Sequence, residues 1–226
     1  MRIGVLGTGA VGRTLAGALD EQGHEVVMGS RDAAAALASA DVNQQTGATL
    51  AGWHDEHAGV RIATFADAAA HGEVVLHATS GAGSLPALAA AGDASLAGKI
   101  VVDIANPLVW SEQEATLSVM NTDSLAEQAQ RQHPSARVVK ALNTVTAAIM
   151  VDPSMLADGD HTLPICGNDE AAKHQVTAWL QEWFGWRDVL DVGDLTAARA
   201  TEAYLLFWLR IYQATGSPIV NTKVVR

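Results

Sequence analysis

The chain opens with MRIGVLGTGAVGRTLAGALD, residues 1–20, and this stretch predicts a strand, a tight turn and a helix. Residues 2–6 form a short apolar run, and residues 10–21 have the alanine- and leucine-rich content of a helix. The turn between them has the spacing G-x-G-x-x-G and reads Gly7-Thr8-Gly9-Ala10-Val11-Gly12.

Each glycine of this turn has a physical role. Gly7 permits the sharp turn out of the strand, Gly9 lets the backbone approach a pyrophosphate, and Gly12 lets the helix pack closely on the sheet. A pyrophosphate at this point lies on the N-terminus of a helix, where free N–H groups and the helix dipole favour negative charge. The hexapeptide is a weak signal alone, but here it follows a strand and opens a helix. We therefore predict a dinucleotide site.

Further short apolar runs follow at residues 25–28, 60–63, 73–78, 99–104 and 137–142, separated by alanine-rich helical stretches. Residues 41–59 are polar, contain glycine and are predicted to be a surface excursion. Short strands that alternate with helices indicate βαβ units and a mostly parallel sheet covered on both faces. The predicted fold class is α/β, a doubly wound sheet of Rossmann type.

The pattern changes beyond about residue 150. A strand at 162–166, a helix at 169–183, a strand at 188–192 and a long helix at 195–215 are predicted there. We predict a dinucleotide-binding domain over residues 1–150 and a small C-terminal α/β extension over residues 151–226. The long helix is apolar on most sides, which favours a contribution to an acceptor pocket and to a homodimer contact.

The formal net charge of −11 argues against nucleic acid or a membrane surface as a partner. A small-molecule redox partner is expected instead. The apolar run at 203–208 is too short to span a bilayer, and a strand that starts at residue 2 leaves no space for a signal peptide, so a cytoplasmic location is expected. Cys166 is the single cysteine, and no Cys/His grouping has the spacing of a zinc site, so no metal is predicted.

The end of the second predicted strand selects between the two nicotinamide dinucleotides. An NAD site usually has a carboxylate there, whereas an NADP site removes it and supplies a cation for the 2′-phosphate. This chain reads Met28-Gly29-Ser30-Arg31, with a hydroxyl at Ser30 and a guanidinium at Arg31. NADP(H) is therefore the predicted cofactor. The alternative is that Ser30 only caps the second helix and Arg31 is a solvated charge.

These residues resemble the coenzyme F420-dependent NADP oxidoreductases, which are related to pyrroline-5-carboxylate reductases and to the cytosolic domain of the six-transmembrane ferric reductases. The resemblance covers nearly the whole chain, and its most specific pieces are residues 2–12, 23–31, 138–144, 164–169 and 191–195, the last leading to Arg199 and Glu202. Members of this family transfer a hydride between NADP and a reduced deazaflavin. The resemblance implies this activity here.

The resemblance also implies roles for particular residues. Thr8, Gly9, Ala10 and Val11 would meet the pyrophosphate and its ribose, and Ser30 and Arg31 the 2′-phosphate. Thr79 and Ser80 would lie near the nicotinamide half, and Ala147 under the rings. The chain departs from the family pattern at residues 143–146, which read Asn-Thr-Val-Thr, at Ala35 and around Ser80.

Several other polar residues are also candidates for a function. Asn106, after the fifth strand, either makes a turn or contacts nicotinamide or ribose. Lys140, Asn143 and Thr144, at the C-terminal end of the sixth strand, are the available proton donors if the substrate were a ketone or imine. The alternative for Lys140 is an ion pair with a carboxylate at a subunit contact. Asn143 is also counted as a cofactor-binding candidate. His77 is predicted to be a hydrogen-bonded core histidine and Cys166 a buried thiol, and the sequence His54-Asp55-Glu56-His57 is predicted to be a solvated loop.

Three functions therefore remain open on the sequence. The first is an NADP(H)-dependent oxidoreductase that acts on a deazaflavin of the coenzyme F420 type. The second keeps NADPH but reduces a flavin, a quinone, a ferric chelate or a small carbonyl compound. The third is a regulatory protein that senses NADP(H) without turnover.

Overall fold

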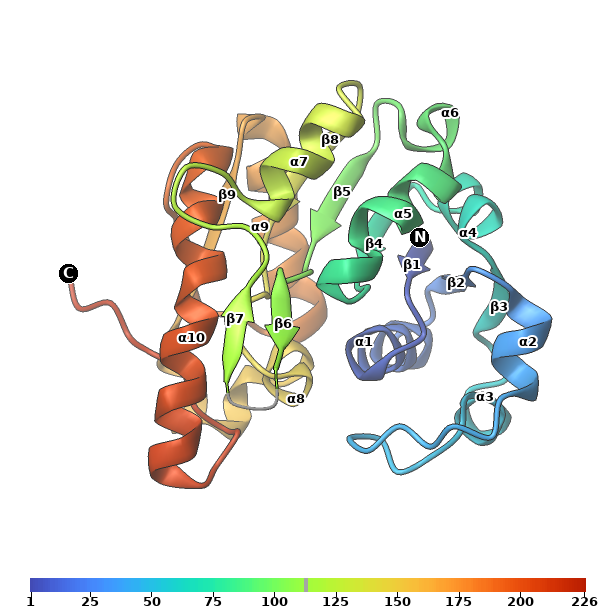
Figure 1. The fold of residues 1–226 in the computed structure, drawn as a ribbon, viewed down its shortest axis with the longest axis horizontal. Helices are drawn as coiled ribbons and strands as arrows, with labels where there is room; N and C mark the ends of the chain where they lie inside the picture. The colour runs from blue at the N-terminus through green and yellow to red at the C-terminus, as the bar shows by residue number, and fades with distance from the viewer. Residues whose placement is uncertain (112–113) are drawn as a thin grey trace.

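The computed structural model describes residues 1–111 and 114–226, and its centre is one twisted sheet (Figure 1). In the described part of the chain this sheet has eight strands in the order β10-β9-β8-β5-β4-β1-β2-β3. The strands are β1 (Arg2–Leu6), β2 (Glu25–Ser30), β3 (Arg61–Thr64), β4 (Val74–His77), β5 (Ile100–Asp103), β8 (Arg137–Lys140), β9 (Thr162–Gly167) and β10 (Asp188–Asp191).

The central order is that of a dinucleotide-binding fold. Strands β1, β2, β3, β4, β5 and β8 pair in parallel, and the chain passes from β3 back across β2 and β1 to β4. The strand order therefore reverses between β1 and β4, and ligands of such sheets bind in the crevice at that point, beyond the carboxyl ends of the strands. The predicted doubly wound, mostly parallel α/β sheet is confirmed.

The C-terminal segment continues the sheet. Strand β9 pairs with β8 in the antiparallel direction, and β10 pairs with β9 in parallel. A 3₁₀ turn at Leu195–Ala197 then leads into the long helix α10 (Ala198–Thr215). Figure 1 shows α10 upright along the edge of the molecule that lies away from β2 and β3. The predicted division at residue 150 remains a prediction.

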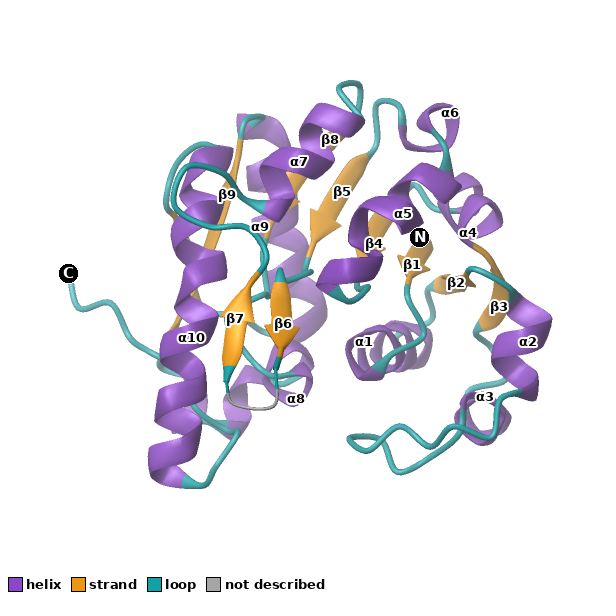
Figure 2. Ribbon diagram, viewed as in Figure 1, coloured by secondary structure: helices purple, strands orange, loops and turns teal. Residues whose placement is uncertain are grey.

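Helices cover both faces of the sheet (Figure 2). One face packs against α1 (Ala10–Glu21), α3 (Leu50–Glu56), α8 (Ala147–Val151) and α9 (Glu170–Phe184). The other packs against α4 (Phe65–His71), α5 (Gly81–Ala91), α6 (Asp93–Leu96), α7 (Leu125–Gln132) and the start of α10. Successive strand side chains point to opposite faces, so Val74 and Leu76 enter the first core and Val75 the second.

The structure corrects three local expectations. The excursion at 41–59 contains α3, whose Trp53 is buried, and it follows the short helix α2 (Ala33–Ala38). A hairpin of β6 (Leu108–Trp110) and β7 (Ala115–Leu117) was not predicted, and β7 lies beside α10 in Figure 1. Ser30 does not cap the second helix, because Asp32 is the N-cap and accepts a hydrogen bond from the Ala35 N–H.

Candidate functional site

The glycine-rich turn has the backbone geometry that its sequence predicted. Gly7 has a φ of +118°, a conformation that L side chains rarely adopt. A Cβ on Gly12 would lie 2.0 Å from the carbonyl oxygen of Gly7, so the first turn of α1 packs against the chain leaving β1. A Cβ on Gly9 would meet no described atom within 4 Å, so the turn is open at this residue.

The N-terminus of α1 faces this open position. The first intrahelical hydrogen bond runs from the Arg13 N–H to the Gly9 carbonyl at 2.9 Å. The N–H groups of Ala10, Val11 and Gly12 therefore precede the helical hydrogen-bond pattern and are available to an anion.

A cavity of about 320 Å³ lies where the strand order reverses. Its lining combines the turn after β1, the turn after β4 and one side of α5. It brings together six of the predicted site residues, Gly7, Thr8, Gly9, Arg31, Thr79 and Ser80, with six that were not predicted, Phe65, Ala78, Gly83, Pro86, Ala87 and Ala90. Ala78 ends the apolar run predicted at 73–78, whereas Phe65 of α4 and the four residues of α5 carry no binding motif and are brought to the cavity by packing.

Ser30 provides a test of whether the site fits the 2′-phosphate of NADP. Its side chain is 7% exposed, and its hydroxyl has no hydrogen-bond partner among the described residues. A buried hydroxyl normally has a partner, so its position at the carboxyl end of β2 suits a ligand. Arg31 follows it, is exposed and lines the cavity. The two residues together offer a hydroxyl and a guanidinium, the donors that a phosphate requires.

Arg13 is a buried cation beside the turn that the sequence analysis missed. Its guanidinium, on a residue 5% exposed, donates to the carbonyl oxygens of Thr8 at 2.9 Å and Ala48 at 2.8 Å, and to the Thr46 hydroxyl at 3.3 Å. No carboxylate in residues 1–111 or 114–226 pairs with it. Burial lowers the pKa of Arg13 from its ordinary value. Arg13 therefore adds uncompensated positive charge beside the amides that face an anion.

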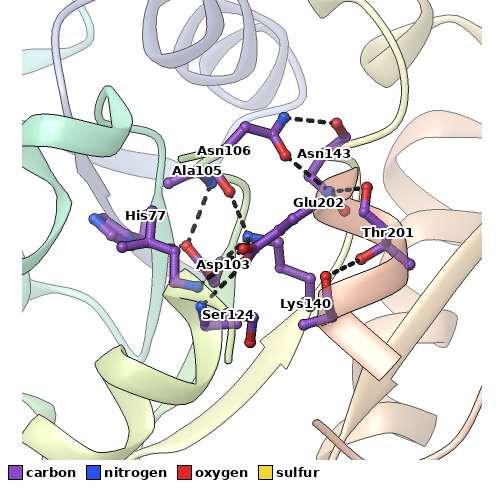
Figure 3. Close-up of polar contacts among 12 residues, drawn as sticks. His77, Asp103, Ala105, Asn106, Ser124, Lys140, Asn143, Thr201 and Glu202 are labelled. Atoms are coloured by element: carbon purple, nitrogen blue, oxygen red, sulfur yellow. Dashed lines mark hydrogen bonds and ion pairs between the residues drawn. The ribbon is translucent and has the colours of Figure 1, made fainter. Parts of the chain in front are cut away.

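Asn106 and Asn143, both predicted cofactor contacts, pair with each other beyond the ends of β5 and β8 (Figure 3). The Asn106 amide donates to the Asn143 backbone carbonyl at 2.8 Å, and the Asn143 amide donates to the Asn106 side-chain oxygen at 3.0 Å and to the Thr201 carbonyl at 2.9 Å. The Asn143 side-chain oxygen and the hydroxyls of Thr144 and Thr146 are buried without partners among the residues described. Ala147, the remaining predicted contact, begins α8.

A row of ionisable side chains is buried beneath this edge. His77, Asp103 and Lys140 are in register across β4, β5 and β8, and all three are 0% exposed. His77 Nδ1 lies 2.9 Å from Asp103 Oδ1, and the Lys140 ammonium lies 2.8 Å from Asp103 Oδ2. Lys140 also donates to the Ala105 carbonyl (Figure 3). The prediction that His77 is a hydrogen-bonded core histidine is confirmed.

Glu202 reaches the same row from α10. It is 1% exposed, lies 2.9 Å from the Lys140 ammonium, and accepts hydrogen bonds from the Leu125 and Ala126 N–H groups at the start of α7. Burial raises the pKa of Glu202, and the Lys140 charge only partly opposes this. Burial would also raise the pKa of Asp103, but Lys140 and His77 hold it below its ordinary value. Both carboxylates therefore depend on the same ammonium group.

Comparisons with known proteins place the chain in a family. The family model for NADP oxidoreductases dependent on coenzyme F420 matches residues 2–107. A crystal structure described as a candidate F420-dependent NADP-reductase from Arthrobacter sp. FB24 is 51% identical, covers 100% of both chains and superimposes with a TM-score of 0.95. The chain belongs to this family. The predicted resemblance is therefore confirmed, and the protein is an NADP-dependent oxidoreductase.

Two further similarities are more distant. The metalloreductase STEAP3 of Rattus norvegicus is 32% identical over 89% of this chain, which spans 36% of that protein. A reductive aminase from Aspergillus terreus, solved with NADPH4, cyclohexanone and allyl amine, is 20% identical, and the match covers 94% of this chain and 62% of that one with a TM-score of 0.62. The reductive aminase shows similarity of fold alone.

The structure also locates Cys166 and the segment His54-Asp55-Glu56-His57. Cys166 is buried as predicted, and burial raises the pKa of its thiol to about 12. His57 stacks on Trp53, with ring centroids 4.3 Å apart, at the end of α3 rather than in a solvated loop.

In the described residues no group of three or more His, Cys, Asp or Glu side chains could hold a metal ion. None of the helices described is both long and apolar enough to cross a membrane.

Proposed function

We propose that this oxidoreductase transfers a hydride between NADP(H) and a deazaflavin of the coenzyme F420 type. The observation that carries the proposal is the burial of the ionisable groups at the carboxyl edge. Asp103 and Lys140 are 0% exposed, Glu202 is 1% exposed, and the Lys140 ammonium pairs with both carboxylates. Hydride transfer between two planar rings needs alignment and exclusion of water rather than a side-chain acid.

The residues that would hold the dinucleotide follow from the site. The amides at the start of α1 would bind the pyrophosphate, and Ser30 with Arg31 would bind the 2′-phosphate. Asn143 would offer its unpartnered side-chain oxygen beside the Asn106 amide. When bound, the nicotinamide supplies or accepts the hydride, and the chain's own groups only position it.

A reductase of a ferric chelate, flavin or quinone is the second candidate. The similarity to a metalloreductase over 89% of this chain favours it. A small carbonyl or imine substrate fits less well, because Lys140, the candidate ammonium donor, is enclosed by Asp103, Glu202 and the Ala105 carbonyl. An NADP(H) sensor would bind the dinucleotide without oxidising it.

We also propose that the protein is a homodimer in which α10 contributes to the contact. Phe207 and Tyr212 on this helix are 57% and 40% exposed, and a second copy of the chain would cover them. The residues of α10 that are buried within the chain, Ala198, Thr201 and Glu202, all lie in its first turns. The exposed side of the later turns, which carries Phe207 and Tyr212, is available to a partner.

A panel of acceptors tests the enzymatic proposal. Purified protein is mixed with NADPH and, in separate reactions, with a deazaflavin of the F420 type, FMN, a quinone and ferric citrate, and absorbance of the reduced nicotinamide is followed. Oxidation with the deazaflavin at a rate well above the other acceptors is expected. Faster turnover with ferric citrate or FMN would select the second candidate. Tight binding of NADPH with no oxidation by any acceptor would leave only the sensor.

A further inference from the structure

A hydroxyl, an imidazole and a carboxylate stand in series between the cavity and the buried charges. Thr79 Oγ1 lies 2.8 Å from His77 Nε2, and His77 Nδ1 lies 2.9 Å from Asp103 Oδ1. Thr79 lines the cavity, whereas His77 and Asp103 are fully buried. The cavity and the ionisable row of His77, Asp103 and Lys140 are therefore joined by hydrogen bonds (Figure 3 shows the buried part).

The charged end of the series fixes the positions of its protons. Asp103 pairs with the Lys140 ammonium and is held in the ionised form, so its oxygens can only accept. His77 Nδ1 must therefore carry the hydrogen in the bond to Asp103. A ring that carries only this hydrogen has Nε2 as an acceptor.

The proton on Thr79 follows from this. A neutral Nε2 can only accept, so the Thr79 hydroxyl donates its single hydrogen to His77. Its lone pairs then face the cavity. A phosphate oxygen is also an acceptor and gains nothing from such a group, whereas a hydroxyl of a ligand can donate to it.

We infer that Thr79 binds a ribose hydroxyl of the dinucleotide as a hydrogen-bond acceptor, and that His77 and Asp103 are positioning residues that hold it in this polarity. The inference rests on the proposed dinucleotide site and adds a specificity determinant to it. Neither His77 nor Asp103 lines the cavity, so both act through Thr79. The two members of the series beyond Thr79 were not among the predicted cofactor contacts.

A double-mutant cycle on NADPH affinity tests the series. Thr79→Val removes the acceptor and is expected to weaken NADPH binding by about 2- to 13-fold, the range for one hydrogen bond, whereas Thr79→Ser retains the affinity. His77→Leu frees the Thr79 hydrogen to rotate into the cavity and is expected to cause a similar loss. In the Thr79→Val background the His77→Leu change should add no further loss. Independent, additive losses would overturn the inference.

A matched control separates this role from general stability. His133 is also a buried histidine bonded to a carboxylate, that of Asp93, but it lies at the end of α7 and outside the cavity lining. His133→Leu is expected to lower thermal stability while leaving NADPH affinity unchanged. An equal loss of NADPH affinity in the His133 variant would show that burial alone explains the effect of His77.

Two further readouts address the proton positions and the ligand group. In protein labelled with ¹⁵N-histidine, His77 is expected to show the Nδ1–H tautomer, and an Nε2–H tautomer would overturn the inference. Inorganic pyrophosphate, which has no ribose, should compete with NADPH for binding equally well in the wild type and in Thr79→Val. Weaker competition in the variant would show that Thr79 contacts phosphate. Wild-type protein that binds no NADPH would overturn the proposed function itself. Binding that is unchanged in Thr79→Val would overturn only the inference.

Discussion

Replacing Lys140 by methionine should destabilise the protein far more than the loss of one surface ion pair. The Lys140 ammonium lies 2.8 Å from an Asp103 oxygen and 2.9 Å from a Glu202 oxygen, and all three side chains are almost completely buried. Methionine fills the space of the lysine stem but leaves two carboxylates uncompensated. Removing one partner of a buried ion pair costs about 3–5 kcal/mol. For a chain of this length that corresponds to a melting temperature lower by roughly 6–20 °C.

Lys173 supplies the matched control. It is 2% exposed and lies 2.8 Å from both Glu170 and Asp191, so it is as buried and as well paired as Lys140. Its carboxylate partners are 74% and 41% exposed, however, and water can solvate them when the ammonium is removed. Lys173→Met should therefore cost about 1 kcal/mol or less. Circular dichroism during thermal and urea unfolding would measure both variants, and equal losses would refute the reasoning.

The loss of stability in Lys140→Met should depend on pH. The folded-state pKa of Asp103 lies below its unfolded value, so the wild type has this stabilisation above the unfolded pKa and loses it as the pH falls through the folded pKa. Without Lys140 the carboxylates bind protons in the folded state at a higher pH. The deficit of Lys140→Met should therefore shrink between pH 8 and pH 5. A deficit that is constant over that range would show that packing, and not charge, causes the loss.

Four other predictions follow from the site and the surface. Arg31→Ala should weaken NADPH by about 1–3 kcal/mol, the range for a charge-assisted contact, with little change for NADH; an equal loss for both dinucleotides in titrations would exclude a 2′-phosphate contact. Gly9→Ala should retain the melting temperature but weaken NADPH binding at least about tenfold, because a Cβ there meets no described atom and enters the open turn. Gly12→Ala should instead lower the free energy of unfolding by about 1–3 kcal/mol through overpacking. The reverse pattern would contradict the geometry. Cys166 should resist a thiol reagent at pH 7.5 until the protein is unfolded, because burial raises its pKa to about 12, and rapid reaction of native protein would disprove this. Phe207→Glu should convert a dimer into a monomer in sedimentation experiments, and a wild type that sediments as a monomer would exclude the α10 contact.

The strands of the sheet could be predicted because their signals are local. The apolar runs at 25–28, 99–104 and 137–142 overlap β2, β5 and β8 in the structure, and the helix predicted at 10–21 has the observed bounds. The hairpin of β6 and β7 was missed because its residues are half-exposed or exposed and show no clear alternation of apolar and polar side chains. Helix α3 was missed because its two buried residues, Leu50 and Trp53, make one i,i+3 pair, which is too little to show a helical period.

The cavity was only partly predictable for a related reason. A turn motif names the residues after β1, but the opposite wall comes from α5 and Phe65, which are placed by tertiary packing. Similarly, Lys140 could be recognised as a candidate, while its partners Asp103 and Glu202 come from separate elements and share no sequence pattern with it. Ser30 shows the opposite case, because the sequence allowed both a cap and a phosphate ligand, and the structure assigns the cap to Asp32.

The position of Glu202 limits how the C-terminal segment can be exchanged. A carboxylate from the last helix lies between β8 and α7, where it pairs with Lys140 and accepts hydrogen bonds from the first two N–H groups of α7. Recombining residues 1–150 with a foreign C-terminal segment would therefore leave Lys140 without its second counterion and the Leu125 and Ala126 N–H groups without their acceptor. A graft intended to change the substrate would have to bring its own acid to the position of Glu202.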